Sequence, residues 1–145
     1  MKLAWLLWMA SLMPPHAADQ TCLATTVYLE ARGEPVIGQM AVAEVAMRRR
    51  EMKLWGDTVC DVVTAPRQFA TTTVPSSYAL DNLQAWNRAW AIAGQALQNW
   101  KLPRAERTDV VPHADHFVKA DSPMPDWAHG TPLAVIGDHR FYAAN

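Results

Sequence analysis

Two glutamates, Glu30 and Glu34, lie four residues apart in the segment YLEARGEP. Carboxyl groups serve enzymes as general acids and bases, and the surroundings of each group decide which role it takes. Gly33 is typical of a helix end, and Pro35 is typical of the first residue of a following helix. The two glutamates are therefore predicted to lie on different elements, in different surroundings.

Glu30 is predicted to lie on the apolar face of its helix. Leu23 comes seven residues before it and Val27 three before it, and at about 100° per residue all three point roughly the same way. An unpaired carboxylate buried there is costly, so its pKa rises, and a carboxylic acid protonated near neutral pH is what a general acid requires. Glu34 instead lies at the start of the next helix, whose dipole favours the ionised form.

A structural role for these glutamates is an alternative. Glu30 could form a buried pair with Arg32, Arg49 or a histidine. Glu44 is a second candidate acid, but we interpret it as the partner of Arg48, four residues further along the same helix.

A group of histidines forms a second candidate site. His113, Asp115 and His116 lie in one segment, and His129 and His139 follow. Such residues can hold zinc, but their spacing matches no established motif such as H-E-x-x-H. Histidines on a strand beside a cleft more often hydrogen-bond a substrate or support a carboxylate, so we predict neither a metal nor another cofactor.

The first two thirds of the chain are predicted to be helical. A helix over residues 20–31, with Asp19 as its N-cap, precedes a helix over 35–52 that is apolar on nearly all sides and is expected to be buried. Asp57 is expected to cap a short helix with the sequence TVCDVV. After a turn-rich segment, a long helix over 82–100 carries one apolar stripe with three tryptophans. We expect core packing for most of them, with sugar stacking as the alternative.

The last third of the chain changes in character. HADHFV predicts a strand, and the two prolines of SPMPDW predict a loop. LAVIGDHRFY predicts two short strands that turn at Gly137-Asp138. Helices followed by a small antiparallel sheet indicate a single, helix-rich α+β domain.

The composition fits one globular domain. The chain has 145 residues, half of them apolar, and a formal net charge of −1, which is sufficient for a domain with its own core. The longest basic run, Arg48-Arg49-Arg50, is followed by Glu51 and is interpreted as a solvated helix end. We expect a monomer with no nucleic-acid partner.

Residues 1–18 have the features of a signal peptide or an N-terminal anchor. Lys2 is followed by the apolar run LAWLLWMASLM and then by PPHAA. The run is shorter than the roughly 20 residues that span a bilayer, so we expect no stable membrane span after processing. Removal near Ala18 would leave a domain over residues 19–145, exported to the periplasm or secreted.

The chain contains two cysteines, Cys22 and Cys60. In an exported protein, an even pair is expected to form one disulfide. The alternative is two buried thiols, because free cysteine is among the most buried residue types.

The motifs EARGEP and GQMAVA, followed by QF, DHF, PDWA and IGDHRFY, resemble the SleB-type cell wall hydrolases, a family of spore cortex-lytic enzymes and related bacterial and phage lysins. The resemblance extends from Cys22 to Tyr142. It implies a lysozyme-like or lytic-transglycosylase-like α+β fold, peptidoglycan glycan strands as the substrate, and Glu30 as the catalytic acid. It also implies further positions in or near the cleft: Glu34, Gln68, Phe69, His116, Trp127, His139 and Tyr142.

Two positions depart from the family pattern. The family's Asn-Arg after the second helix is Arg48-Arg49 here, and its Thr-His-Tyr is Asp115-His116-Phe117. Both changes concern fine contacts to substrate and leave Glu30 in place.

The resemblance favours lytic transglycosylation, in which one carboxyl group suffices because the substrate supplies its own nucleophile. A hydrolytic muramidase would need a second carboxylate about 5–10 Å away, from Glu44, Asp115 or Asp121. A zinc-dependent amidase and a non-catalytic wall-binding module are further alternatives. An exported domain of this size fits either a host remodelling enzyme or a phage endolysin.

Overall fold

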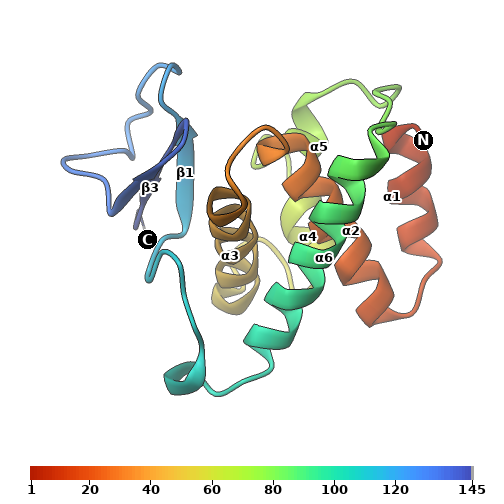
Figure 1. Cartoon of the computed structure of the whole chain (residues 1–145), viewed down its shortest axis with the longest axis horizontal. Helices are drawn as coiled ribbons and strands as arrows, with labels where there is room; N and C mark the ends of the chain where they lie inside the picture. Colours follow the sequence, from red (N-terminus) through yellow and green to blue (C-terminus); the bar gives the residue numbers. More distant parts are fainter. Residues whose placement is uncertain (145) are drawn as a thin grey trace.

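A helical part and a small sheet lie side by side in the structure, a computed structural model that describes residues 1–144 (Figure 1). Asn145, the last residue of the predicted domain, lies outside the described residues. The predicted order, helices first and an antiparallel sheet last, is confirmed. The elements are α1 (Leu3–Ser11), α2 (Pro15–Ala31), α3 (Val36–Met52), α4 (Val59–Thr64), α5 (Ala70–Thr73), α6 (Leu83–Trp100), η1 (Arg104–Glu106), β1 (His116–Lys119), β2 (Ala134–Ile136) and β3 (His139–Tyr142).

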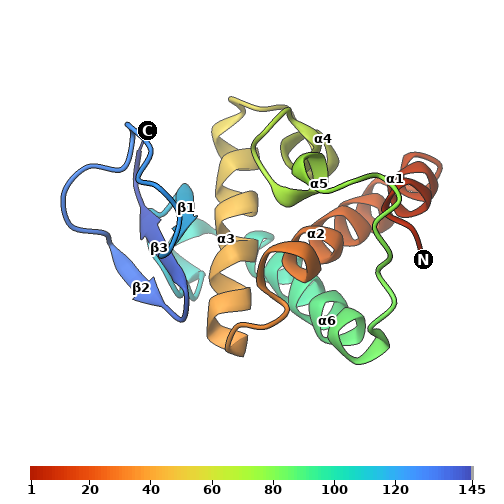
Figure 2. The ribbon, with the colours of Figure 1, turned by 90° about the horizontal axis from the view of Figure 1, so that it is seen from above.

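Helix α3 separates the rest of the helical part from the sheet, as the view from above shows (Figure 2). Its middle, from Ala41 to Met47, is buried, which confirms the prediction of a buried helix. Leu23, Val27 and Tyr28 of α2 are fully buried in the same core. The first turn of α3 extends beyond this core, so Val36 and the residue after it stay exposed.

The three strands form an antiparallel sheet in the order β1-β3-β2. Strands β2 and β3 are joined at Gly137-Asp138, as predicted, and Gly137 has a φ of 55°, which a two-residue hairpin turn requires. Opposite β3, Phe117 pairs with Phe141 and Lys119 with His139. Because side chains alternate along a strand, these four residues share one face of the sheet.

The predicted helix caps were wrong at two positions. Helix α2 begins at Pro15, a residue that suits a first turn, so Asp19 lies inside the helix. Its carboxylate accepts a hydrogen bond from the Val59 amide (3.0 Å) and contacts Arg50 (3.1 Å). Helix α4 is capped by Thr58, which forms a reciprocal capping box with Asp61, and not by Asp57.

The arginine run at the end of α3 was also misinterpreted as solvated. Arg49 is only 3% exposed, and its guanidinium lies 4.8 Å from the Trp55 ring and 4.7 Å from the Phe69 ring. Arg48 donates to the main-chain oxygen of Ala114. Arg49 is buried and Arg48 half-buried because the sheet and the preceding loop cover the last turns of α3.

The tryptophans of α6 divide between the core and the surface. Trp100 is buried, which confirms core packing at this end of the helix. Trp86 is half-buried against Tyr28, with 6.4 Å between their rings. Trp90 is 39% exposed, so it is the exception to the core packing that was predicted for most of these tryptophans, because the stripe continues past the edge of the core.

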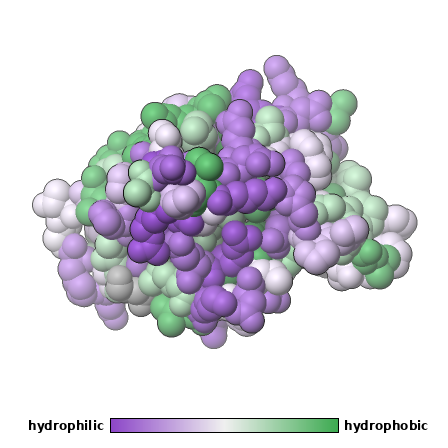
Figure 3. Space-filling view, turned by 90° about the horizontal axis from the view of Figure 1, so that it is seen from below, coloured by the Kyte–Doolittle hydropathy of each residue, from purple (hydrophilic) through white to green (hydrophobic). Residues whose placement is uncertain are grey.

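Residues 1–18 form α1 and the start of α2. Leu3, Leu6 and Ala10 pack into the core cluster, while Trp5 and Trp8 are exposed on the outer side. Figure 3 shows a largely hydrophilic centre on the underside of the molecule and paler, more apolar atoms at the α1 end, on the right. Among the helices within residues 1–144, none has the length and apolar character needed to cross a membrane. Removal of the segment stays a prediction.

The predicted disulfide is present. Cys22 of α2 and Cys60 of α4 are bonded, at a separation of 38 positions in sequence. The disulfide joins α4 to α2, close to the hydrogen bond between Asp19 of α2 and the Val59 amide of α4.

Candidate active site

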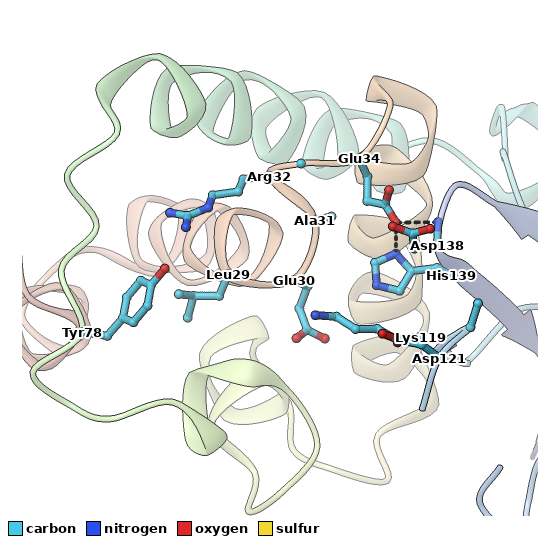
Figure 4. Close-up of a pocket in the computed structure, with 12 residues that line it drawn as sticks. Leu29, Glu30, Ala31, Arg32, Glu34, Tyr78, Lys119, Asp121, Asp138 and His139 are labelled. Atoms are coloured by element: carbon cyan, nitrogen blue, oxygen red, sulfur yellow. Dashed lines mark hydrogen bonds and ion pairs between the residues drawn. The ribbon is translucent and has the colours of Figure 1, made fainter. Parts of the chain in front are cut away.

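A cavity of about 480 Å³ opens between the C-terminal end of α2 and the sheet (Figure 4). The loop between α5 and α6 contributes one side of it, and the β2–β3 turn contributes the opposite side. Its lining residues are Leu29, Glu30, Ala31, Arg32, Gly33, Glu34, Tyr78, Lys119, Ala120, Asp121, Asp138 and His139. Three of the residues predicted for the site, Glu30, Glu34 and His139, therefore line one cavity.

Glu30 is the carboxyl group with the most altered acidity in this cavity. Burial raises its pKa to about 7, although three groups favour its charged form: the Lys119 ammonium, a hydrogen bond with the Ala70 backbone and the Arg49 guanidinium. Figure 4 shows the Glu30 carboxyl group and the Lys119 ammonium facing one another. The predicted buried acid is thus present in the structure, and it faces a cavity that a substrate can enter.

Lys119 was missed by the sequence interpretation. It stands opposite His139 in the β1–β3 register, on the same face of the sheet as Phe117. Phe117 lies within the DHF motif, so two-residue alternation from Phe117 would have placed Lys119 on that face. Which element that face covers could not be predicted.

Glu34 joins the α2–α3 turn to the β2–β3 turn. Its Oε1 accepts a hydrogen bond from the Asp138 amide (2.8 Å) and lies 3.1 Å from His139 Nδ1. A side chain at Gly137 would place its Cβ 2.6 Å from Glu34 Oε2. Burial lowers the pKa of His139, and the Glu34 carboxylate opposes that change. These contacts fix Glu34 between the two turns at the edge of the cavity, and its part in substrate binding stays a prediction.

Three other predicted site residues gather on the opposite face of the sheet. His116 and Tyr142 are partners in the β1–β3 register, and the Trp127 ring lies 4.6 Å from the first and 5.7 Å from the second. His116 Nδ1 is 2.8 Å from Asp115 Oδ1, and burial lowers the pKa of His116. None of the three lines the cavity of Glu30, because alternation along β1 and β3 turns them away from it.

Gln68 and Phe69 support the site from the loop before α5. Phe69 is 2% exposed and packs against Phe117, with 6.0 Å between the rings. Arg49 donates to Gln68 Oε1 (3.3 Å) and to the main-chain oxygen of Asp115 (2.7 Å). Neither residue lines the cavity; both directly precede Ala70, whose backbone favours the charged form of Glu30.

Glu44 has the structural role that was predicted for it. Its carboxylate accepts hydrogen bonds from the amides of Val110 (2.6 Å) and Val111 (3.0 Å) and lies 3.8 Å from Arg48.

The histidines do not belong to a metal-binding cluster. Across the described part of the chain, no three His, Cys, Asp or Glu side chains are grouped so that they could hold a metal ion.

A comparison with known families identifies the domain. The sequence model of the family described as Cell Wall Hydrolase matches residues 33–142. The chain belongs to the cell wall hydrolase family. The match includes all the predicted site residues except Glu30, which lies three positions before its first residue.

Individual members of this cell wall hydrolase family are similar over most of the chain. The spore cortex-lytic enzyme of Oceanobacillus iheyensis is 31% identical over 124 residues, which is 85% of the chain and 41% of that enzyme. The spore cortex-lytic enzyme of Halalkalibacterium halodurans is 43% identical over 125 residues, or 85% of the chain and 34% of the enzyme. The chain thus spans about two fifths or less of the length of these curated relatives.

A solved structure of the cell wall hydrolase family has the same fold. The crystal structure of the catalytic domain of the Bacillus cereus SleB protein superposes with a TM-score of 0.68 at 28% identity, covering 86% of the chain and 88% of that domain. The predicted SleB-type family and the predicted helix-rich, lysozyme-like α+β fold are both confirmed.

Proposed function

We propose that the domain cleaves the glycan strands of peptidoglycan by lytic transglycosylation, with Glu30 as the general acid and then the general base. The observation that carries the proposal is a carboxyl group with a pKa of about 7 in a cavity of about 480 Å³. The likeness to spore cortex-lytic enzymes and to the SleB catalytic domain supports peptidoglycan as the substrate.

In the first step, protonated Glu30 donates its proton to the oxygen that links N-acetylmuramic acid to N-acetylglucosamine. The bond between that oxygen and the muramic anomeric carbon breaks, and positive charge develops on this carbon. N-acetylglucosamine leaves with a free hydroxyl group. Since half of the Glu30 population is protonated near pH 7, the acid is available under neutral conditions.

In the second step, the Glu30 carboxylate takes the proton of the muramic C6 hydroxyl group. The C6 oxygen attacks the anomeric carbon and closes a 1,6-anhydro ring, and Glu30 is again protonated. Lys119 favours the charged form of Glu30, so it stabilises the carboxylate between the two steps. One carboxyl group completes the reaction.

Hydrolysis is the second candidate, because Asp121 lines the same cavity as Glu30. Glu44 and Asp115, the other carboxylates considered for this role, are buried and accept main-chain hydrogen bonds from Val110 and Ala144. Asp121 would then activate a water molecule on the face of the sugar opposite Glu30. No observation favours a zinc-dependent amidase or a non-catalytic wall-binding module.

Mass spectrometry of digested peptidoglycan distinguishes the two reactions. Transglycosylation gives 1,6-anhydro-muramic ends, and an Asp121→Asn variant retains them at a similar rate. Reducing muramic ends without anhydro product, lost in Asp121→Asn, would show that the domain is a hydrolytic muramidase.

A further inference from the structure

The two ends of the Glu30 cavity differ in charge. Arg32 and Tyr78 form the end away from the sheet, and Figure 4 shows Leu29 between this pair and Glu30. At the sheet end lie the carboxyl groups of Glu34 and Asp138. Arg32 supplies the positive charge on the helical side of the cavity. Lys119, the other cation of the lining, comes from the sheet and faces Glu30.

The Arg32 guanidinium is held in place although it is exposed. Its Nη1 donates to the Tyr28 hydroxyl (2.9 Å), and its central carbon lies 5.1 Å from the centroid of the Tyr28 ring. Tyr28 is completely buried, and its hydroxyl also accepts from the Asn82 amide (3.2 Å). Tyr78 lines the same end of the cavity beside Arg32. An anchored guanidinium loses little conformational entropy when it binds a ligand.

This anchoring leaves binding capacity unused. A guanidinium has five N–H donors, and the hydrogen bond to the Tyr28 hydroxyl occupies one of them. Within residues 1–144, no carboxylate lies within the 4.0 Å ion-pair distance of Arg32. The cation is therefore free to pair with an acidic group of a ligand, and guanidinium groups bind carboxylates with paired hydrogen bonds.

We propose that Arg32 and Tyr78 form a subsite for a carboxylate carried by the muramoyl residue of the substrate. The inference rests on the proposed function, because muramoyl residues are the acid-bearing sugars of peptidoglycan. The carboxylate has two sources: the stem peptide, where one is attached, or the 3-O-lactyl group, where the peptide has been removed. N-acetylglucosamine carries neither group, so the subsite fixes which sugar lies on the helical side of Glu30.

Binding measurements test the subsite without turnover. The inactive Glu30→Gln variant is titrated calorimetrically with peptide-bearing strands, with strands stripped by an amidase, and with neutral N-acetylglucosamine oligosaccharides. Adding Arg32→Gln should weaken binding of the acidic strands about 10- to 100-fold, the range of a charge-assisted hydrogen bond, and leave the neutral oligosaccharides unchanged. Arg32→Lys should reduce the affinity for the acidic strands by less. The matched control Arg88→Gln, which replaces an exposed arginine of α6, should leave that affinity unchanged.

The strand types identify the source of the carboxylate. A loss confined to peptide-bearing strands assigns the stem peptide, a loss confined to stripped strands assigns the lactyl group, and a loss with both shows that the subsite accepts either. An equal loss with neutral oligosaccharides, or no loss at all, would overturn the subsite. If Glu30→Gln digests peptidoglycan as fast as the wild type, the proposed function fails instead, whatever the binding data show.

Discussion

Glu30 combines two properties that a proton donor requires. Burial raises its pKa to about 7, and its carboxyl group still faces an open cavity. The cationic groups around it, Lys119 and Arg49, together with the Ala70 backbone, limit this rise. The balance keeps both protonation states populated near neutral pH, as a residue that acts first as an acid and then as a base requires.

The pH dependence of kcat/KM on peptidoglycan should show this balance. The proposed reaction starts from protonated Glu30, so we expect activity to fall as the pH rises through about 7. Lys119→Met removes a charge that lowers the pKa of Glu30 and should move this decrease to higher pH. Lys101→Met, which changes an exposed lysine outside the cavity, should leave the profile unchanged; a decrease at the same pH in all three proteins would contradict the role of Lys119.

Some residues of the site could be predicted from the sequence. Helix phase with Leu23 and Val27 correctly predicted that Glu30 is a partly buried acid. Lys119 and Tyr78 could not be found, because strand alternation defines a face but not the element that the face covers, and the loop around Tyr78 has no periodicity. Contacts formed between distant segments decide both positions.

At the scale of elements, the site depends on two turns that meet. The α2–α3 turn supplies Glu34, and the β2–β3 turn supplies the Asp138 amide and His139. The sequence predicted both turns, at Gly33-Glu34-Pro35 and at Gly137-Asp138. It did not predict that they touch, since they are more than a hundred residues apart. A contact between distant segments also explains the wrong cap at Asp19. The residue was predicted to cap its own helix, but its carboxylate accepts a hydrogen bond from the Val59 amide of α4.

Replacement of Gly137 by alanine should therefore damage the site as well as the turn. The residue has a positive φ, and the added Cβ would lie 2.6 Å from Glu34 Oε2. We expect a loss of about 1–3 kcal/mol in the free energy of unfolding, measured by urea denaturation. Gly33→Ala is the control, because a Cβ at Gly33 meets nothing within 4 Å; equal stabilities of the two variants would contradict the contact.

At the scale of the whole molecule, residues 1–18 have two competing descriptions. Their sequence predicts a signal peptide, whereas in the structure the side of α1 that carries Leu3 and Leu6 packs into the core. The apolar residues that an export signal requires also suit a helix that packs on a core. The same sequence is therefore compatible with both descriptions. The fold class itself was predictable, because long helical periodicity and a two-residue hairpin turn are local signals.

The intact mass of the protein recovered from the periplasm or the medium tests the processing prediction. We expect a chain that begins near residue 19 and retains the Cys22–Cys60 disulfide. A mass that corresponds to all 145 residues would contradict signal-peptide removal and would make α1 a permanent part of the exported fold.

The proposed role of Glu30 as the acid of a glycan-cleaving enzyme can be tested directly. Purified peptidoglycan is incubated with the wild type and with Glu30→Gln, and the soluble products are identified by mass. We expect anhydro-muramic fragments from the wild type and a loss of at least about a thousandfold in Glu30→Gln, whose amide cannot donate the proton. Wild-type release of fragments that persists undiminished in Glu30→Gln would contradict this role.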